Sequence, residues 1–234
     1  MESQSSSQAE SGNGTLSETA VQLTLEMIQQ HPAGKIPEFT PLDDQTTPEF
    51  NQPASRIIVW FQSQVQEIYD PARQGGAWER DPEWAQIFKS QHTSGELFAT
   101  RVRDLSLAII RVRFDVRGDA DRLLEHARHD LKRAQQRLEE CDAQRSGSRK
   151  SADREQRLQA AIELGRAAAL LPLAEMVHRV PAADVELVRK MSRQIKPVLR
   201  PHANDDLLQE LVELARPRNN QIIQAGYEAD ESRN

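Results

Sequence analysis

The sequence predicts an all-α protein: an antiparallel helical hairpin or coiled coil with additional packed helices and a disordered N-terminus. Two observations lead to this prediction. Apolar residues recur at alternating spacings of four and three through much of residues 98–168, which is typical of helices with one buried face. A short polar break at 145–151 separates two such runs, and a chain interrupted in this way folds back on itself.

The N-terminal part is predicted to hold one helix between two irregular segments. Residues 1–16 are polar and rich in Ser and Gln, so they bury too little apolar surface to offset chain entropy and are predicted to be disordered. Thr15 and Glu18 fit a capping box, and the apolar spacing that follows predicts a helix over about 17–31. Five prolines within 32–54 predict an extended linker.

The next segment, 55–70, has apolar residues at helical spacing, with Ser55 as its N-cap. Its β-prone run Ile57–Phe61 leaves a strand as the alternative. Asp70-Pro71 and the pair Gly75-Gly76 are expected to end this element.

A further helix is predicted from Asp81-Pro82-Glu83, which has the order N-cap, first-position proline and first-turn acid. Nine of the eleven aromatic residues lie within 39–98, so the large packing anchors belong to the first half of the chain. We therefore treat 17–92 as a small aromatic-rich helical region that contains the Pro-rich linker.

A long helical seam follows another capping-box pattern, Thr93 and Glu96. Residues 110–116 within it also alternate as a strand would, but no second alternating run offers that strand a partner, so helix is the preferred interpretation of 108–117. The apolar residues of the seam are predicted to be interaction residues: Phe98, Val102, Leu105 and Ile109.

Beyond Gly118, Ala and Leu alternate at the same spacing as far as Cys141. Ser151 is predicted to cap the return arm, whose apolar run is expected to kink at Pro172. Because small residues let two helices approach closely, we assign 93–180 to a long helical hairpin. Further predicted interaction residues are Leu124, Leu131 and Leu138.

Residues 181–234 are predicted to form C-terminal helices and a frayed tail. Pro181 starts the first of these helices, and Asn204 caps a second one with an acidic first turn. The residues of the first helix that are expected to face inward are Val185, Val188, Met191 and Ile195.

Composition limits the classes of function. The net charge is -6, yet residues 101–200 hold 22 basic and 15 acidic residues, so total charge does not exclude nucleic acid as a partner. The single cysteine excludes an intrachain disulfide framework and a multi-Cys zinc site. No apolar run approaches about 20 residues and the first 20 residues lack a signal pattern. We therefore expect no membrane span and a location in the cytoplasm or another reducing compartment.

Two kinds of candidate site deserve testing. His126 and His129 share a helix face and are weak candidates for metal ligands, while Cys141 falls on the seam as an inert small residue. A basic cluster at the hairpin loop can attract phosphate, and its members are Arg145, Arg149, Lys150, Arg154 and Arg157.

The leading functional hypothesis is a non-enzymatic scaffold, adaptor or assembly subunit that acts through coiled-coil contacts with a protein partner or a second copy. The seam at 98–141 is longer than its return arm, so part of it is left for another chain or for the C-terminal helices. The alternatives are a nucleic-acid-associated protein that uses the basic hairpin 101–157 and a metal-dependent helical-bundle enzyme. No cofactor is expected.

Overall fold

The computed structural model describes residues 15–34, 50–117, 120–144 and 151–195. All regular secondary structure within these ranges is helical, which confirms the all-α class. The helices are α1 (Glu18–Gln30), α2 (Ala54–Ile68), α3 (Pro71–Trp78), α4 (Pro82–Ser90), α5 (Gly95–Arg117), α6 (Ala120–Gln144), α7 (Ser151–His178), α8 (Ala182–Lys190) and α9 (Ser192–Ile195).

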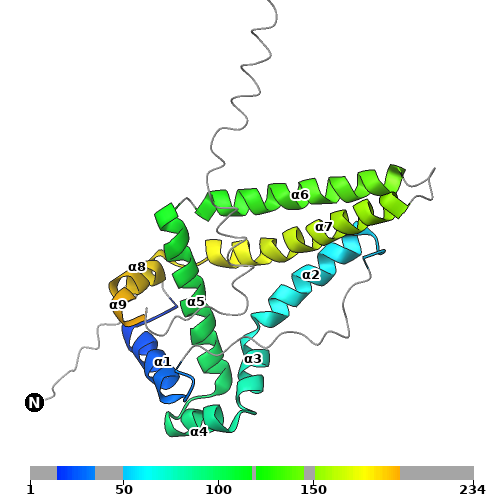
Figure 1. Cartoon of the computed structure of the whole chain (residues 1–234). Coiled ribbons are helices and arrows are strands. Elements are labelled where there is room, and N and C mark those ends of the chain that lie inside the picture. Colours follow the sequence, from blue (N-terminus) through cyan, green and yellow to red (C-terminus); the bar gives the residue numbers. More distant parts are fainter. Residues whose placement is uncertain (1–14, 35–49, 118–119, 145–150, 196–234) are drawn as a thin grey trace, which may run out of the picture.

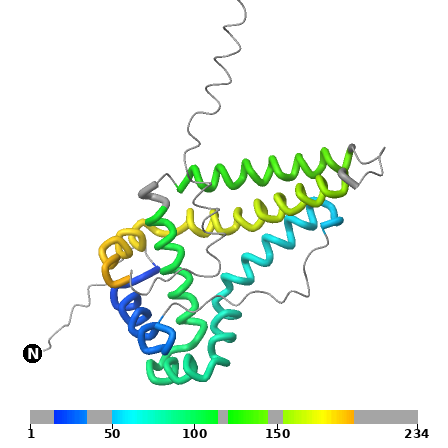
Figure 2. The backbone as a smooth tube through the Cα atoms, viewed as in Figure 1, coloured from blue at the N-terminus to red at the C-terminus, as the bar shows by residue number. Residues whose placement is uncertain are grey.

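The helices form two connected parts (Figure 1). α6 and α7 lie antiparallel as a hairpin, and α2 packs along α7 on the side away from α6. A second group contains α1, α3, α4, α8 and α9, and α5 extends from this group to the start of the hairpin, as the tube in Figure 2 also shows. The long helix α5 therefore belongs to both parts and holds them together.

The core of the second group is built around one face of α5. Phe98 is fully buried, and its ring centroid lies 5.0 Å from that of Trp84, 5.3 Å from that of Phe88 and 5.8 Å from that of Trp78. Residues of α1, α8 and α9 cover the rest of this face. The inward residues predicted for the C-terminal region are all buried there, namely Val185, Val188, Met191 and Ile195.

The hairpin is held together by small side chains and by α2. Leu138 of α6, Leu164 of α7 and Ile57 of α2 are fully buried in one cluster. Phe61 of α2 lies directly over Gly165 of α7, where a Cβ atom would come within 2.4 Å of the ring. The glycine thus creates the space that allows α2 to pack closely on α7.

The capping box predicted at Thr15 and Glu18 is wrong. Helix α1 is capped by Ser17, whose Oγ accepts a hydrogen bond from the Ala20 amide at 3.1 Å. Thr15 instead donates from Oγ1 to Oδ2 of the buried Asp184 on α8, at 2.7 Å. Several hydroxyl residues precede this helix, and the contact with α8 determines which of them is free to cap it.

Two more predicted caps are displaced. Helix α2 begins one residue before Ser55 and has no side-chain cap. Helix α5 is capped by Ser94 rather than Thr93, because the Leu97 amide donates to Ser94 Oγ at 3.2 Å. In contrast, the predicted Asp81 cap of α4 is confirmed, with bonds to Asp81 Oδ1 from two amides of the first turn.

Helix α2 ends at Ile68, just before Asp70-Pro71, as predicted, but Gly75 and Gly76 do not break the chain, since both lie inside α3. This helix crosses the start of α5, and a Cβ atom added to Gly75 would lie 2.3 Å from the Glu96 backbone nitrogen. The glycine therefore permits a close approach of two backbones rather than a chain reversal.

The remaining predictions divide into those tested and those outside the described ranges. Helix α5 continues through 110–116, so the preference for helix over strand is confirmed, and α7 continues through Pro172. Predictions for the tail 1–14, the linker residues 35–49, the loop 145–150 and the segment 196–234 lie outside the described residues.

Candidate functional site

An open groove runs between α6 and α7. Its larger part is a hollow of about 650 Å³, and a smaller hollow of about 390 Å³ continues it toward the hairpin loop. The two hollows share Arg137, Glu140 and Glu163. We call this surface the hairpin groove; it is lined by Ala127, Asp130, Arg133, Ala134, Gln136, Arg137, Glu140 and Cys141 of α6, and by Gln156, Gln159, Ala160, Glu163, Arg166, Ala167 and Leu170 of α7.

Alanines form most of the floor of the hairpin groove. Ala127, Ala160 and Ala167 are all buried, and they lie at positions three, four or seven residues from other lining residues of the same helix. Alanine at such positions brings the helix backbones close together and leaves a shallow trough above them. The lining spans residues 127–141 of α6, which corresponds to about 20 Å of helix.

The rim carries balanced charge. Three arginines and three acidic residues line the larger hollow. Arg137 of α6 donates to Glu163 of α7 at 2.6 Å, so one ion pair crosses the trough between its two walls. On the α6 wall, Arg133 lies 3.5 Å from Asp130. Both arginine side chains are more than half exposed, so these charges can rearrange around an approaching molecule.

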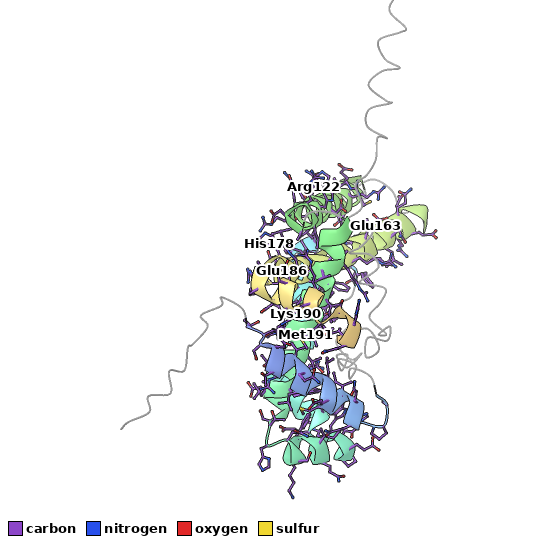
Figure 3. The ribbon with its side chains drawn as sticks, turned by 90° about the vertical axis from the view of Figure 1, so that its left-hand side faces the viewer. Arg122, Glu163, His178, Glu186, Lys190 and Met191 are labelled. Atoms are coloured by element: carbon purple, nitrogen blue, oxygen red, sulfur yellow. The ribbon has the colours of Figure 1, made fainter. Side chains whose placement is uncertain are left out.

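At the opposite end of the hairpin, a histidine of α7 contacts an aspartate of α6. His178 Nε2 of α7 lies 2.7 Å from Asp121 Oδ1 of α6. Figure 3 faces this end of the molecule and labels Arg122 near the start of α6 and His178 near the end of α7. This contact joins the two arms at this end, while the hairpin groove lies nearer to the loop.

The predicted interaction residues lie inside the protein or along the hairpin. The four from α5 are buried against α1, α3, α4, α8 and α9. Of the three from α6, Leu138 is fully buried, Leu124 is 9% exposed and Leu131 is half-buried. Periodicity identified a buried face correctly, but it does not tell which chain covers that face. The residues buried on α5 are Phe98, Val102, Leu105 and Ile109.

The two histidines proposed as metal ligands sit on the surface of α6. The His129 side chain is 67% exposed, and its Nδ1 lies 3.6 Å from Asp130 Oδ1, while His126 is half-buried. Among the described residues, the group whose ligand atoms converge is a different one: His31, Asp81 and Glu83. Sequence reasoning missed it because 50 residues separate the histidine from the first carboxylate, and no local spacing marks such a pair.

The basic cluster is divided in the structure. Arg154 is exposed at the start of α7. Arg157, one turn further, is only 7% exposed, and its guanidinium is bonded to Asp142 and to the carbonyl groups of Phe50 and Gln52. In this structure Arg157 therefore joins α6, α7 and the segment before α2. The three remaining members, Arg145, Arg149 and Lys150, lie outside the described residues.

Cys141 is a free, half-buried thiol on the lining of the hairpin groove. Burial raises the pKa of Tyr69 to about 12, which keeps its hydroxyl neutral inside the cluster between α2, α6 and α7. No helix in the described part of the chain combines the length and the apolar character required to cross a membrane.

Comparison of the chain with protein-family models, with curated protein sequences and with solved structures found no match.

Proposed function

We propose that the protein is a non-enzymatic helical scaffold or adaptor, and that its hairpin groove binds a helix from a protein partner. The observation that carries this proposal is the trough itself: an alanine floor about 20 Å long between two parallel walls that carry charges of both signs. A helix that fits a groove between two helices is a common mode of protein recognition.

The dimensions and the chemistry of the hairpin groove both favour a helical ligand. Small side chains on the floor allow a third helix to approach closely, with its own larger residues packing into the trough. The balanced rim favours a ligand with a defined sequence of charges, because opposed charges contribute more to specificity than to affinity. A strongly cationic or strongly anionic ligand finds no matching field along these walls.

The ion pair between Arg137 and Glu163 provides an adjustable element. Because the Arg137 side chain is 65% exposed and the Glu163 side chain 35% exposed, opening this pair costs no more than about 1 kcal/mol. An incoming helix can therefore exchange this internal contact for bonds to its own charged residues.

The proposal is tested by blocking the floor. Ala134→Trp places a large side chain in the trough, whereas Lys132→Trp places the same side chain on an exposed part of α6 outside the lining. Partners captured by the wild-type protein and by Lys132→Trp, but not by Ala134→Trp, are then purified, and their binding is measured directly with and without nuclease.

We expect a protein partner whose affinity falls at least tenfold with Ala134→Trp and is unchanged by Lys132→Trp or by nuclease. A second copy of this chain counts as such a partner if light scattering shows a dimer that Ala134→Trp dissociates. Binding that requires nucleic acid, or that is unchanged by Ala134→Trp, contradicts the proposal. The alternative to test next is then nucleic-acid binding by the basic hairpin 101–157.

A further inference from the structure

Three side chains with metal-ligating atoms meet where α1 ends and α4 begins. His31 is the residue that follows α1, Asp81 is the N-cap of α4, and Glu83 lies in its first turn. One ligand atom from each lies within 4.8 Å of the other two. We propose that these three residues bind a divalent transition metal ion, with Zn²⁺ as the reference ion, and that the ion fastens α1 to α4. This site is separate from the hairpin groove and does not depend on its function.

The presence of the two carboxylates at the start of α4 has a simpler explanation, since an acidic N-cap and an acidic first turn stabilise many helices. Helix capping does not explain the position of the histidine. Its ring stacks on Trp84, with centroids 4.4 Å apart and an interplanar angle of 11°. Its Nε2 is buried and has no hydrogen-bond partner. The ring is held so that this nitrogen meets the two acids.

The spacing of His31 and Glu83 fits a shared ion. His31 Nε2 lies 3.3 Å from Glu83 Oε2. Two ligands that are each about 2.0–2.2 Å from zinc, at a tetrahedral angle, lie about 3.4 Å apart. The pair therefore already has the separation of one edge of a zinc coordination tetrahedron, although it does not form a hydrogen bond.

Asp81 can join the ion without giving up its role as a cap. The capping bonds from the amides of Glu83, at 2.8 Å, and Trp84, at 3.2 Å, both go to Oδ1. The second carboxylate oxygen, Oδ2, can turn toward the ion, because Asp81 is exposed at the surface. Two negative charges also offset the positive end of α4, which would otherwise oppose a cation at this position.

Metal binding requires one proton to change place on His31. The Ala33 amide donates to His31 Nδ1 at 3.2 Å, so in the absence of metal the ring proton of the neutral imidazole is on Nε2. To bind metal through Nε2, the ring must carry its proton on Nδ1 and release the Ala33 amide. Ala33 is exposed, so water replaces this single bond at little cost.

The donor set determines the class of ion. One imidazole nitrogen and two carboxylate oxygens suit Zn²⁺, Mn²⁺ or Co²⁺ better than Mg²⁺, which prefers oxygen ligands and its own waters. Three protein ligands leave one position of a tetrahedral ion for water. The ion would connect the end of α1 to the start of α4 more firmly than the present contacts do.

The test uses the full, untagged chain and isothermal titration with ZnCl₂, with MgCl₂ titrated in parallel. His31→Phe retains a ring to stack on Trp84 but removes the nitrogen. Asp81→Asn retains the helix cap, because asparagine caps as well as aspartate, and Glu83→Gln removes the charge of the second carboxylate. His129→Ala is the control, since this exposed histidine lies on α6 and far along the chain from the site.

We expect saturable binding of one Zn²⁺ per chain, at least tenfold weakened by His31→Phe and weakened several-fold by Asp81→Asn and by Glu83→Gln. His129→Ala should bind like the wild type, and Zn²⁺ should raise the melting temperature of the wild type but not of His31→Phe. The proposal is overturned by an absence of saturable Zn²⁺ binding, by equal binding to His31→Phe, or by loss of binding in His129→Ala.

Discussion

Arg157 of α7 and Asp142 of α6 form a two-point ion pair at the loop end of the hairpin. Arg157 Nε donates to Asp142 Oδ1 at 2.5 Å, and a terminal nitrogen of the same guanidinium lies 3.3 Å from Oδ2. The guanidinium also donates to the carbonyl groups of Phe50 and Gln52, just before α2. A single buried side chain thus joins α6, α7 and the segment before α2.

The first prediction concerns this arginine. Arg157→Ala should lower the free energy of unfolding by about 2–3 kcal/mol, because it removes hydrogen bonds from a charged donor and leaves backbone carbonyls without partners. The exposed Arg154→Ala should change it by less than about 0.5 kcal/mol. Urea denaturation of both variants measures the difference. Equal stability of the two would show that the buried bonds contribute nothing.

The second prediction concerns the crossing of α3 and α5. A Cβ atom at Gly75 would meet the Glu96 backbone nitrogen at 2.3 Å, whereas Gly76 has nothing within 4 Å of such an atom. We expect Gly75→Ala to cost about 3 kcal/mol or to prevent folding, since backbone cannot move aside as a side chain can.

The neighbouring Gly76→Ala provides the matched comparison for that crossing. It should stabilise α3 by up to about 1 kcal/mol, because alanine favours a helix interior. The stabilities of the two variants are compared by thermal melts that are monitored by circular dichroism. A Gly75→Ala variant as stable as Gly76→Ala would refute the close approach of the two helices.

Particular residues show how far the sequence could predict this fold. The helical spacing from Phe98 to Ile109 identified a buried face, because burial depends on a periodicity that the sequence displays directly. Whether another chain or α8 covers that face depends on contacts between residues about 80 positions apart. The caps failed for a related reason: Thr15 has a suitable hydroxyl, but a distant aspartate on α8 engages it.

The candidate sites were less accessible to sequence reasoning than the fold. In the sequence, Arg157 has the same appearance as the other members of the basic cluster. The structure shows that it is buried and paired with Asp142. His31 is separated from Asp81 by 50 residues, so no local pattern connects them. The alternating Ala residues of α6 were predicted to be packing residues, but which side of the hairpin stays open depends on where α2 packs.

The third prediction separates the fold from the recognition of a partner at the hairpin groove. Arg137→Glu and Glu163→Arg should each lower stability by no more than about 1 kcal/mol, because their ion pair is partly exposed. The double exchange should restore stability, since it recreates the pair in reverse. Under the proposed function, it should not restore binding of the partner, whose charges would now face the wrong walls.

Urea denaturation and direct binding measurements on these three variants test that separation. Partner binding by the double variant at wild-type affinity would mean that the partner does not read the charges of the rim. The function would then rest on another surface.

The fourth prediction concerns alkaline pH and the buried Tyr69. Its pKa is raised by burial from 10.0 to about 12, so the unfolded chain releases this proton at a lower pH than the folded protein does. The contribution of Tyr69 to the free energy of unfolding is therefore complete below pH 10. It is lost as the pH rises toward 12, and the total loss is about 3 kcal/mol.

The chain has two tyrosines, Tyr69 and Tyr227, so Tyr227→Phe allows Tyr69 to be observed alone by absorbance at alkaline pH. In this variant we expect the remaining tyrosine to ionise near pH 12 in the folded protein and near pH 10 in urea. Tyr69→Phe should also lose less stability than the wild type between these two pH values. Ionisation of the folded protein near pH 10 would mean that water reaches the hydroxyl, which the packing of α2 against α7 is predicted to prevent.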